Sequence, residues 1–190
     1  MERPILFSTP MAQAILDGRK TQTRRIIKPQ GSAVCFDVAM KIDGSDKWPR
    51  NLDDDERYLS YMKCPYGKIG DILWCRETWQ KIEGDRFIYK ADSIIWGGKW
   101  KPSIFMPKAA CRIKLEIINI RVEKLLDISE EEAKAEGVEL YNNYDGTKGG
   151  WGAPVTFKEG YQFLWESING KDSWNLNPWV WVISFKRIKP

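Results

Sequence analysis

The chain has 190 residues, 43% of them hydrophobic, which predicts one domain with a hydrophobic core rather than two full domains. No stretch approaches the roughly 20 apolar residues of a membrane span, and the N-terminal residues lack the pattern of a signal peptide, so a cytoplasmic protein is expected. The sequence contains no histidine, which excludes histidine-based catalysis, and its net charge of +4 is too mild to indicate nucleic acid by itself.

The first predicted element is a short helix in STPMAQAILDGRK, with Thr9 as its N-cap, Pro10 at its first position and Gly18 just past its end. The following TQTRRIIK is predicted to be extended and to stop at Pro29. Basic residues crowd this part of the chain and could meet phosphate groups: Arg19, Lys20, Arg24, Arg25 and Lys28.

Three segments have the composition of insertions, and we expect them to be irregular: 31–68, 92–108 and 141–155. Together they carry four tryptophans outside the predicted elements: Trp48, Trp96, Trp100 and Trp151. Indole faces stack on nucleobases, so these side chains could cap a pocket or stack on the bases of a substrate.

Three strands are predicted in the middle of the chain. GDILWCRETW follows a Gly-Asp turn and is rich in strand formers, RFIYKAD is its expected partner strand, and CRIKLEIINIRVEKL alternates apolar with charged residues. The last element of the chain, PWVWVISFKRI, is so apolar that we expect it to be central or covered on both faces.

Two further helices are predicted from capping boxes. Ser129 and Glu132 form the first box, and Gly137 marks the end of that helix. Thr156 and Glu159 form the second box. The helix that follows carries a stripe predicted to face the core: Phe157, Tyr161, Leu164, Trp165 and Ile168.

This order of elements predicts one α+β domain over residues 1–190, whose mostly antiparallel sheet curls towards a small barrel. The four cysteines include no CxxC pair: Cys35, Cys64, Cys75 and Cys111. We expect them to be reduced thiols packed as small hydrophobic side chains rather than zinc ligands. No metal and no cofactor is expected.

The basic turn raises a question of chemistry. Lys20 and Thr23 lie three residues apart where the extended segment begins. A lysine in a partly desolvated pocket loses some preference for its charged form and can take a proton from a hydroxyl, which makes threonine a usable nucleophile. The two residues form either such a dyad or part of an ordinary solvated turn, and their spacing alone does not decide between these readings.

Other charges stand where local structure does not favour them. Glu136 is expected at a helix C-terminus, where the helix dipole disfavours a carboxylate, so it either serves a site or is simply exposed. Arg76 and Glu77 lie in an otherwise apolar strand. Because charged residues are seldom buried unpaired, we expect these two to pair across the sheet or to line a polar cavity.

The segment that contains these residues, ILDGRKTQTRR, resembles the opening motif of the ASCH family, part of the PUA-like superfamily of small RNA-associated β-barrels. GDILW resembles that family's turn into a barrel strand, DISEEEAKAEG its helix and WVWVISFKRI its closing strand, in the family's order over nearly the whole chain. The pattern is most similar to phage and prophage ASCH-like proteins. This resemblance implies a PUA-like barrel.

The resemblance also implies an activity. Some small ASCH proteins resemble amidohydrolases that remove the acetyl group from N(4)-acetylcytidine with a Lys, a Thr and a Glu, which match Lys20, Thr23 and Glu136 here. Thr23 would be the nucleophile, Lys20 the base and later proton donor, and Glu136 the partner that positions Lys20 or the leaving amine. The residues implied in substrate binding are Arg19, Arg24, Arg25, Arg76, Glu77 and Trp79.

Within this interpretation, Arg19, Arg24 and Arg25 would contact phosphate or polar base edges, or pair with Glu77. The three insertions make the chain longer than the compact amidohydrolases, so a free nucleoside and a larger RNA substrate both stay open.

Two functions of other classes also stay open. A non-catalytic module could bind RNA or a modified base through Arg24, Arg25 and Arg76, with loop tryptophans stacking on bases. A ribonuclease is a variant of that alternative, although the sequence has no clear metal cluster and no histidine pair. A phage protein-interaction factor could instead use the tryptophan-rich loops as a binding patch. The oligomeric state is not predicted.

Overall fold

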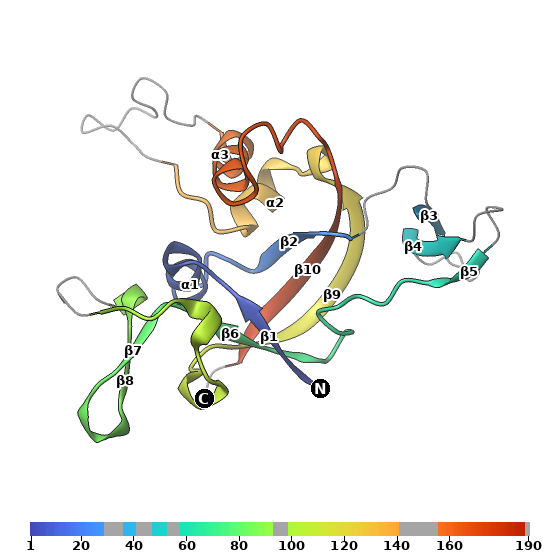
Figure 1. Cartoon of the computed structure of the whole chain (residues 1–190). Coiled ribbons are helices and arrows are strands. Elements are labelled where there is room, and N and C mark those ends of the chain that lie inside the picture. Colours follow the sequence, from blue (N-terminus) through green and yellow to red (C-terminus); the bar gives the residue numbers. More distant parts are fainter. Residues whose placement is uncertain (29–35, 41–46, 53–57, 93–98, 141–155, 189–190) are drawn as a thin grey trace.

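A computed structural model describes residues 1–28, 36–40, 47–52, 58–92, 99–140 and 156–188 of the chain (Figure 1). In these ranges the protein combines three α-helices with β-sheet, which confirms the predicted α+β class. The helices are α1 Thr9–Leu16, α2 Glu130–Ala135 and α3 Phe157–Asn169. None of the described helices has the length and apolar character needed to span a bilayer.

The main sheet has five strands within the described residues, in the order β1-β6-β9-β10-β2. The strands are β1 Glu2–Leu6, β2 Gln22–Ile26, β6 Ile72–Arg76, β9 Lys114–Lys124 and β10 Trp179–Ile188. β1 pairs with β6 in parallel and the other neighbours pair antiparallel, so the sheet is mostly antiparallel as predicted. No pairing joins β1 to β2 in the described part of the chain, so the sheet there is open rather than closed into a barrel.

Strand β1 is not among the elements predicted from the sequence, because Pro4 stands in its middle and its apolar run is only Ile5 and Leu6. Proline lacks a backbone donor and is tolerated at the edge of a sheet. β1 occupies such an edge, with β6 as its single neighbour in the described sheet. Ile5 of this strand is nevertheless 2% exposed and belongs to the core.

Strand β10 lies between β9 and β2 and is covered on both faces, as its apolar sequence predicts. Trp181, Ile183 and Phe185 belong to one core cluster, together with three residues of α1: Met11, Ala12 and Ile15. Val180 and Val182 belong to a second cluster, which contains the buried aromatic residues of α3. Figure 1 shows β9 and β10 as long curved strands, with α2 and α3 together beside their upper parts.

The alternation of buried and exposed residues in β9 changes phase near its middle. Ile117 and Ile120 are both buried, although two residues separate them, because the pairing with β10 shifts by one residue here. Ile118, which falls at this shift, is 47% exposed. Such a bulge adds one residue and bends the strand. As a result Arg121 and Glu123 lie on the face opposite to Ile120.

The helices begin at, or within one residue of, the positions that local sequence signals predict. Both predicted capping boxes form: Ser129 Oγ accepts from the Glu132 amide at 3.2 Å, and Thr156 Oγ1 accepts from the Glu159 amide at 3.1 Å. In α1 the N-cap is Ser8, one residue earlier than predicted, and its side chain makes no capping bond.

The apolar stripe of α3 faces the core except at its end. Tyr161 and Trp165 are each 3% exposed, and Phe157 and Leu164 pack partly buried against the same cluster. Ile168 is 60% exposed, so the prediction that it belongs to the core is wrong. The last turn of α3 borders a cavity, described below, and nothing in the described chain covers Ile168 there.

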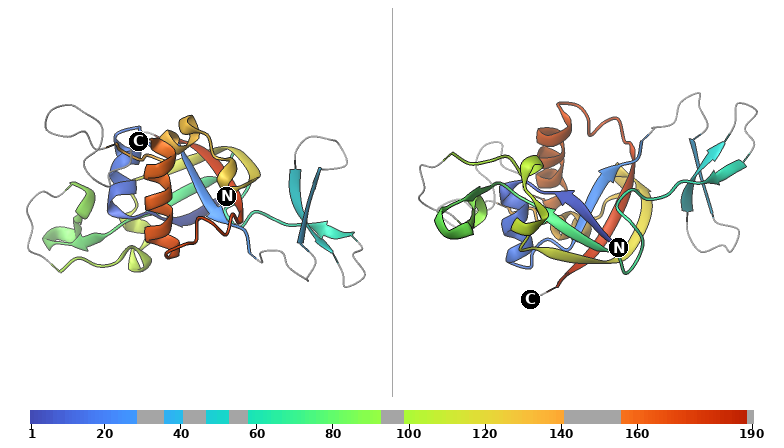
Figure 2. Two further views of the ribbon diagram at one scale, coloured as in Figure 1. Left: turned by 90° about the horizontal axis from the view of Figure 1, so that it is seen from above. Right: turned by 60° about the horizontal axis from the view of Figure 1, so that its bottom comes forward.

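The first insertion is not irregular where the structure describes it. It forms an antiparallel sheet of three strands, β3 Phe36–Met40, β4 Lys47–Leu52 and β5 Tyr58–Tyr61. Both views in Figure 2 show this sheet projecting to one side of the main sheet. The strands are short and lie among turn-forming residues, so the sequence pattern does not predict them. The residues 141–155, Cys35, Trp96, Trp151 and the side chain of Trp48 lie outside the described part.

A second small sheet pairs β7 Trp79–Lys81 with β8 Phe87–Tyr89. RFIYKAD therefore pairs with the end of the GDILWCRETW segment, as predicted, but in a sheet separate from β6. Trp100, in the second insertion, is half-buried, and its neighbour Lys101 bridges to Trp79. Single 3-10 turns complete the described elements: Glu83–Asp85, Lys90–Asp92, Ser103–Phe105, Lys108–Ala110 and Leu125–Asp127.

Candidate functional site

The backbone brings Lys20 next to Glu136. After α1 the chain turns at Gly18, whose φ of +78° is a conformation that residues with a side chain rarely adopt. It then runs beside the end of α2, where the Thr21 amide donates to the Ala135 oxygen at 2.9 Å and Lys20 forms an isolated antiparallel bridge with Glu136. Two residues that are 116 positions apart in the sequence thus become neighbours.

The side chains of these two residues form a buried ion pair. Lys20 Nζ lies 2.8 Å from Glu136 Oε2 and also donates to the Glu136 backbone oxygen at 2.8 Å. Both side chains are 2% exposed, a degree of burial that charged residues rarely reach unless they are paired. The ammonium group also explains how a carboxylate is tolerated at the end of α2, because a cation offsets the unfavourable helix dipole.

Burial lowers the pKa of the Lys20 ammonium below its usual value of 10.5, because desolvation penalises the charged form. The charge of Glu136 and its hydrogen bond raise this pKa, while the positive charges of Arg25 and Arg24 lower it further. A lysine with a lowered pKa is a better proton acceptor near neutral pH. Burial therefore makes the neutral form of Lys20 more accessible than in an exposed lysine.

Lys20, Thr23 and Glu136 all line one cavity of about 490 Å³. Thr23 is 4% exposed, and its hydroxyl makes no hydrogen bond within the described part of the chain. The cavity is also lined by the aromatic side chains of Phe7 and Tyr161. The structure thus brings together, around a space of ligand size, the three residues that the sequence singles out for chemistry.

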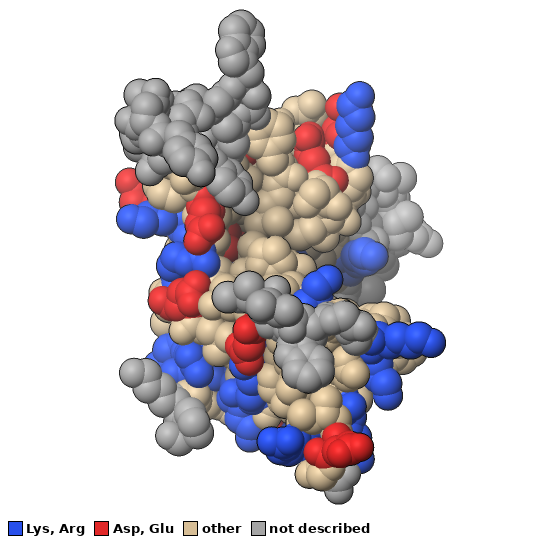
Figure 3. All heavy atoms as spheres, turned by 90° about the vertical axis from the view of Figure 1, so that its left-hand side faces the viewer, with Lys and Arg blue, Asp and Glu red and all other residues tan. Residues whose placement is uncertain are grey.

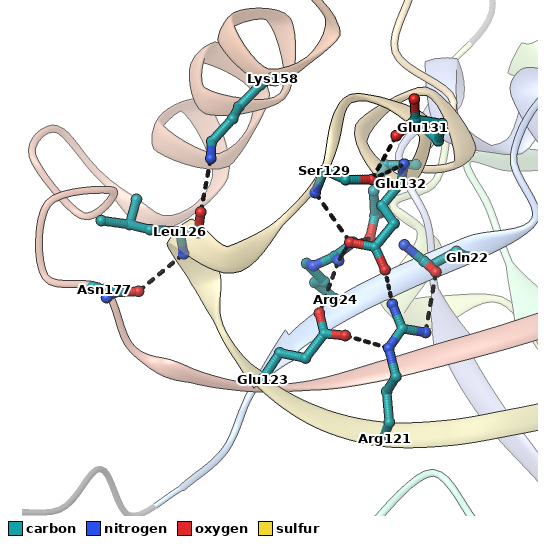
Figure 4. A network of polar contacts seen from close by, with 11 residues as sticks. Gln22, Arg24, Arg121, Glu123, Leu126, Ser129, Glu131, Glu132, Lys158 and Asn177 are labelled. Carbon is teal, nitrogen blue, oxygen red and sulfur yellow. Dashed lines mark hydrogen bonds and ion pairs between the residues drawn. The ribbon is translucent and has the colours of Figure 1, made fainter.

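Arg24 is directed into a group of glutamates rather than towards solvent (Figure 4). Its side chain is fully buried, and Nη2 lies 3.1 Å from Glu123 Oε2 and 2.9 Å from Glu132 Oε2. Nη1 lies 3.3 Å from Glu136 Oε1. Three carboxylates already contact this guanidinium. Its geometry therefore favours a role in holding Glu136 in place, rather than the contact with phosphate or a base edge that the sequence suggests.

Arg121 completes this polar network from the bulged half of β9. It pairs with both Glu123 and Glu132, and Nη1 donates to Gln22 Oε1 at 3.5 Å (Figure 4). The network therefore balances three cations against three carboxylates: Lys20, Arg24 and Arg121 against Glu123, Glu132 and Glu136. Sequence reasoning missed Arg121 and Glu123 and read Glu132 only as a capping residue. The available signal was Arg24 itself, since an arginine in a core strand requires partners.

Arg25 and Lys28 line the same cavity, and neither forms an ion pair in the described part of the chain. Arg25 Nη2 donates to the Leu6 oxygen at 2.6 Å, and the guanidinium lies 5.3 Å from the centre of the Phe7 ring. Lys28 is exposed. The sequence predicts Arg25 as a site residue and places Lys28 in the basic cluster that could meet phosphates, whereas Phe7, which precedes α1, was not predicted.

Arg19 lies apart from this cavity. Its Nη2 lies 3.0 Å from Asp17 Oδ2 and 3.0 Å from Glu139 Oε1, and its Nη1 donates to the Gly137 oxygen at 3.1 Å. It lines a different cavity of about 540 Å³ beside α1 and α3. The structure therefore does not bring Arg19 to Lys20, Thr23 and Glu136.

The residues predicted around β6 also lie apart from the cavity. Glu77 is 1% exposed and is held by Arg112, whose Nε and Nη2 each lie 2.9 Å from a carboxylate oxygen. The basic turn does not reach Glu77, and Arg76 instead donates to backbone oxygens in the turn 104–106. Trp79 is buried beside Phe87, with ring centroids 5.7 Å apart. Their contacts are those of structural residues.

The described cysteines have the character of small apolar side chains. Cys64, Cys75 and Cys111 are free thiols. Burial raises the pKa of Cys64 to about 11 and that of Cys75 well above its usual range, because the thiolate is poorly solvated there. Within the described ranges no group of three or more Cys, Asp or Glu residues is arranged to hold a metal ion.

No family model, curated protein or solved structure matches the chain. The geometry of the Lys20 cavity is therefore the main guide to function.

Proposed function

We propose that the protein is an ASCH-like amidohydrolase that removes the acyl group from an N(4)-acetylcytidine-type base, in a nucleoside or in RNA. The observation that carries this proposal is the cavity that Lys20, Thr23 and Glu136 all line, with Lys20 Nζ 2.8 Å from Glu136 Oε2. Its volume of about 490 Å³ suits a ligand of nucleoside size, and Phe7 and Tyr161 offer aromatic surface to a base.

In the proposed reaction the Thr23 hydroxyl attacks the acyl carbon while neutral Lys20 accepts the hydroxyl proton. Lys20 then donates this proton to the base nitrogen as the carbon–nitrogen bond breaks, which releases the free amine and leaves an ester on Thr23. Lys20 next accepts a proton from a water molecule whose oxygen attacks the ester carbon. As the bond between this carbon and Thr23 Oγ1 breaks and the acid leaves, Lys20 returns the proton to Thr23 Oγ1, which restores both residues. Glu136 holds the lysine in place through its carboxylate and its backbone oxygen.

The proposal includes a PUA-like fold for the chain. Its support is a mostly antiparallel five-stranded sheet whose long strands β9 and β10 curve, together with the bulge that bends β9 (Figure 1). The Lys20 turn enters β2 at one edge of this sheet.

Thr23→Ala is expected to lower the hydrolysis of N(4)-acetylcytidine more than about a thousandfold, because the acyl group loses its acceptor. The measurement incubates purified protein with N(4)-acetylcytidine and a panel of other acylated cytosines, and follows loss of the acyl group by the ultraviolet shift. The matched control is Thr21→Ala, which removes an exposed hydroxyl two residues away and should leave the rate within about twofold.

A folded parent protein that hydrolyses none of these compounds would contradict the amidohydrolase. The favoured function would then be a module that binds RNA or a modified base, for which Arg25 and Lys28 at the cavity offer cations.

The rate is expected to rise with pH and to level off below pH 10.5. Burial lowers the pKa of Lys20, so the neutral amine that accepts the proton forms at a lower pH than in an exposed lysine. The pH profile of kcat/KM measures this rise, and the midpoint of its rising limb gives the pKa of the base. Because Glu136 raises the pKa of Lys20, Glu136→Gln should move the limb to lower pH. A limb at the usual lysine value in the parent would argue against Lys20 as the base.

A further inference from the structure

The charges around the Lys20 cavity are unevenly neutralised. Among the cavity-lining residues in the described chain, Glu136 is the single carboxylate. Both of its oxygens are already contacted, Oε2 by Lys20 and Oε1 by Arg24. The balanced network therefore leaves neither a free negative charge nor a free positive charge at the inner wall.

Two more cations line the cavity outside this network. Neither Arg25 nor Lys28 pairs with a carboxylate in the described residues. Arg25 Nη2 is used on the Leu6 oxygen, while its Nε is buried and has no hydrogen-bond partner there. Leaving a buried donor unpaired costs free energy. With Glu136 already contacted by Lys20 and Arg24, the charges of Arg25 and Lys28 give the cavity a net positive charge.

The position of these cations along β2 relates them to the nucleophile. Thr23 and Arg25 are two residues apart on one strand, so their side chains leave the same face about 7 Å apart. Lys28 follows just beyond the end of the strand. A ligand whose acyl group reaches Thr23 can therefore extend past Arg25 towards Lys28.

We propose that the substrate carries a phosphate group beside the acylated base, and that Arg25 and Lys28 bind this phosphate. The inference rests on the proposed function and adds the charge of the substrate: a nucleotide rather than an uncharged nucleoside. Arginine suits phosphate because it can donate two parallel hydrogen bonds, and lysine supplies a compact charge. Figure 3 shows Lys and Arg side chains gathered over the lower half of one side of the molecule, which would also attract a polyanion. The phosphate belongs to a mononucleotide or to an RNA chain.

Binding measurements test whether the ligand needs a phosphate group, independently of catalysis. The full chain is titrated calorimetrically with cytidine, cytidine 5′-monophosphate and a short cytidine-containing oligoribonucleotide, at low and at raised salt. At low salt the monophosphate should bind at least about tenfold more tightly than cytidine, and the difference should narrow as salt rises. An oligoribonucleotide that binds more tightly than the monophosphate identifies RNA as the source of the phosphate, and weaker binding identifies the mononucleotide. Equal affinities for cytidine and its monophosphate, or no binding of the monophosphate, would overturn the proposal.

Charge-removing variants assign the contact. Arg25→Gln and Lys28→Gln should each reduce the preference for the monophosphate over cytidine by about tenfold. The matched control is Lys186→Gln, since Lys186 is exposed on β10, pairs with Glu116 at 3.0 Å and does not line the cavity. The control should keep the parent preference. An equal fall in all three variants would mean a general effect of net charge, and the assignment would be wrong.

The two proposals fail separately. If N(4)-acetylcytidine and its 5′-monophosphate are hydrolysed with the same kcat/KM, the amidohydrolase stands and the phosphate contact falls. If no acylated base is hydrolysed while the monophosphate still binds more tightly than cytidine, the phosphate site stands and the reaction falls.

Discussion

Replacing Lys20 with methionine is expected to lower the free energy of unfolding by about 3–5 kcal/mol and to abolish hydrolysis. Methionine has a similar length, but it leaves the Glu136 carboxylate, 2% exposed, without the ammonium that lies 2.8 Å away. The remaining side-chain contact to this carboxylate in the described network is Arg24 at 3.3 Å. Denaturant unfolding of the parent and the variant measures the first effect, and the nucleoside assay measures the second.

The double variant Lys20→Met/Glu136→Gln separates stability from chemistry. It removes both buried charges, so it should recover most of the lost stability while hydrolysis stays absent. Glu136→Gln alone completes a double-mutant cycle, because it leaves the Lys20 ammonium buried with the backbone oxygen as its acceptor. If the losses of the two single variants simply add in the double variant, the side chains are not coupled and the ion pair does not hold the site.

Replacing Gly137 with alanine is expected to lower the free energy of unfolding by about 2–5 kcal/mol, through backbone strain and overpacking together. Gly137 follows the end of α2 with φ at +84°, a conformation that alanine disfavours. A Cβ atom there would lie 2.8 Å from Lys20 Cβ and 2.9 Å from Ala14 Cβ, closer than real Cβ contacts allow. Because Lys20 would have to move, kcat should fall together with stability.

Gly70→Ala is the matched control for this prediction. Gly70 also has a positive φ, +85°, but a Cβ atom there would meet nothing within 4 Å. It should therefore cost only the backbone strain of about 1–2 kcal/mol and leave kcat unchanged. Equal effects of the two substitutions on kcat and on unfolding would contradict the close approach at Lys20.

Signals carried by a few neighbouring residues predicted much of the fold. The boxes that begin at Ser129 and Thr156 satisfy backbone donors within one helical turn, so they form with little dependence on the rest of the chain. The apolar run of β10 requires cover on both faces, and α1 and α3 provide it. By contrast, β1 was not predicted, because it contains Pro4. Proline is tolerated in an edge strand, but the sequence alone does not show which strand lies at the edge.

Partners that are distant in the sequence could not be predicted. Glu77 pairs with Arg112, 35 residues away, rather than with its neighbour Arg76. Adjacent residues of an extended chain point to opposite faces, so proximity in sequence is misleading there. Likewise Arg24 stands among the basic residues of the turn, yet its carboxylate partners come from α2 and β9.

The central residues of the candidate site were predicted from the sequence, but the residues around them were not. Lys20, Thr23 and Glu136 line one cavity, while their role in catalysis stays a prediction. The bulge in β9 directs Arg121 and Glu123 towards the network, and no periodic pattern reveals a strand that changes phase. Arg19 is separated from Lys20 by its own contacts with Asp17 and Glu139, although the two are adjacent in the sequence.

The bridge between Lys20 and Glu136 has a consequence for the order in which the protein matures. During synthesis the N-terminal segment emerges 116 residues before its partner, and until α2 docks, Lys20 is an ordinary hydrated ammonium. Contacts of such long range form slowly, because the intervening chain must first be closed into a loop. A nascent or truncated chain that ends before α2 would therefore contain Lys20 and Thr23 but not the buried ion pair of the proposed site.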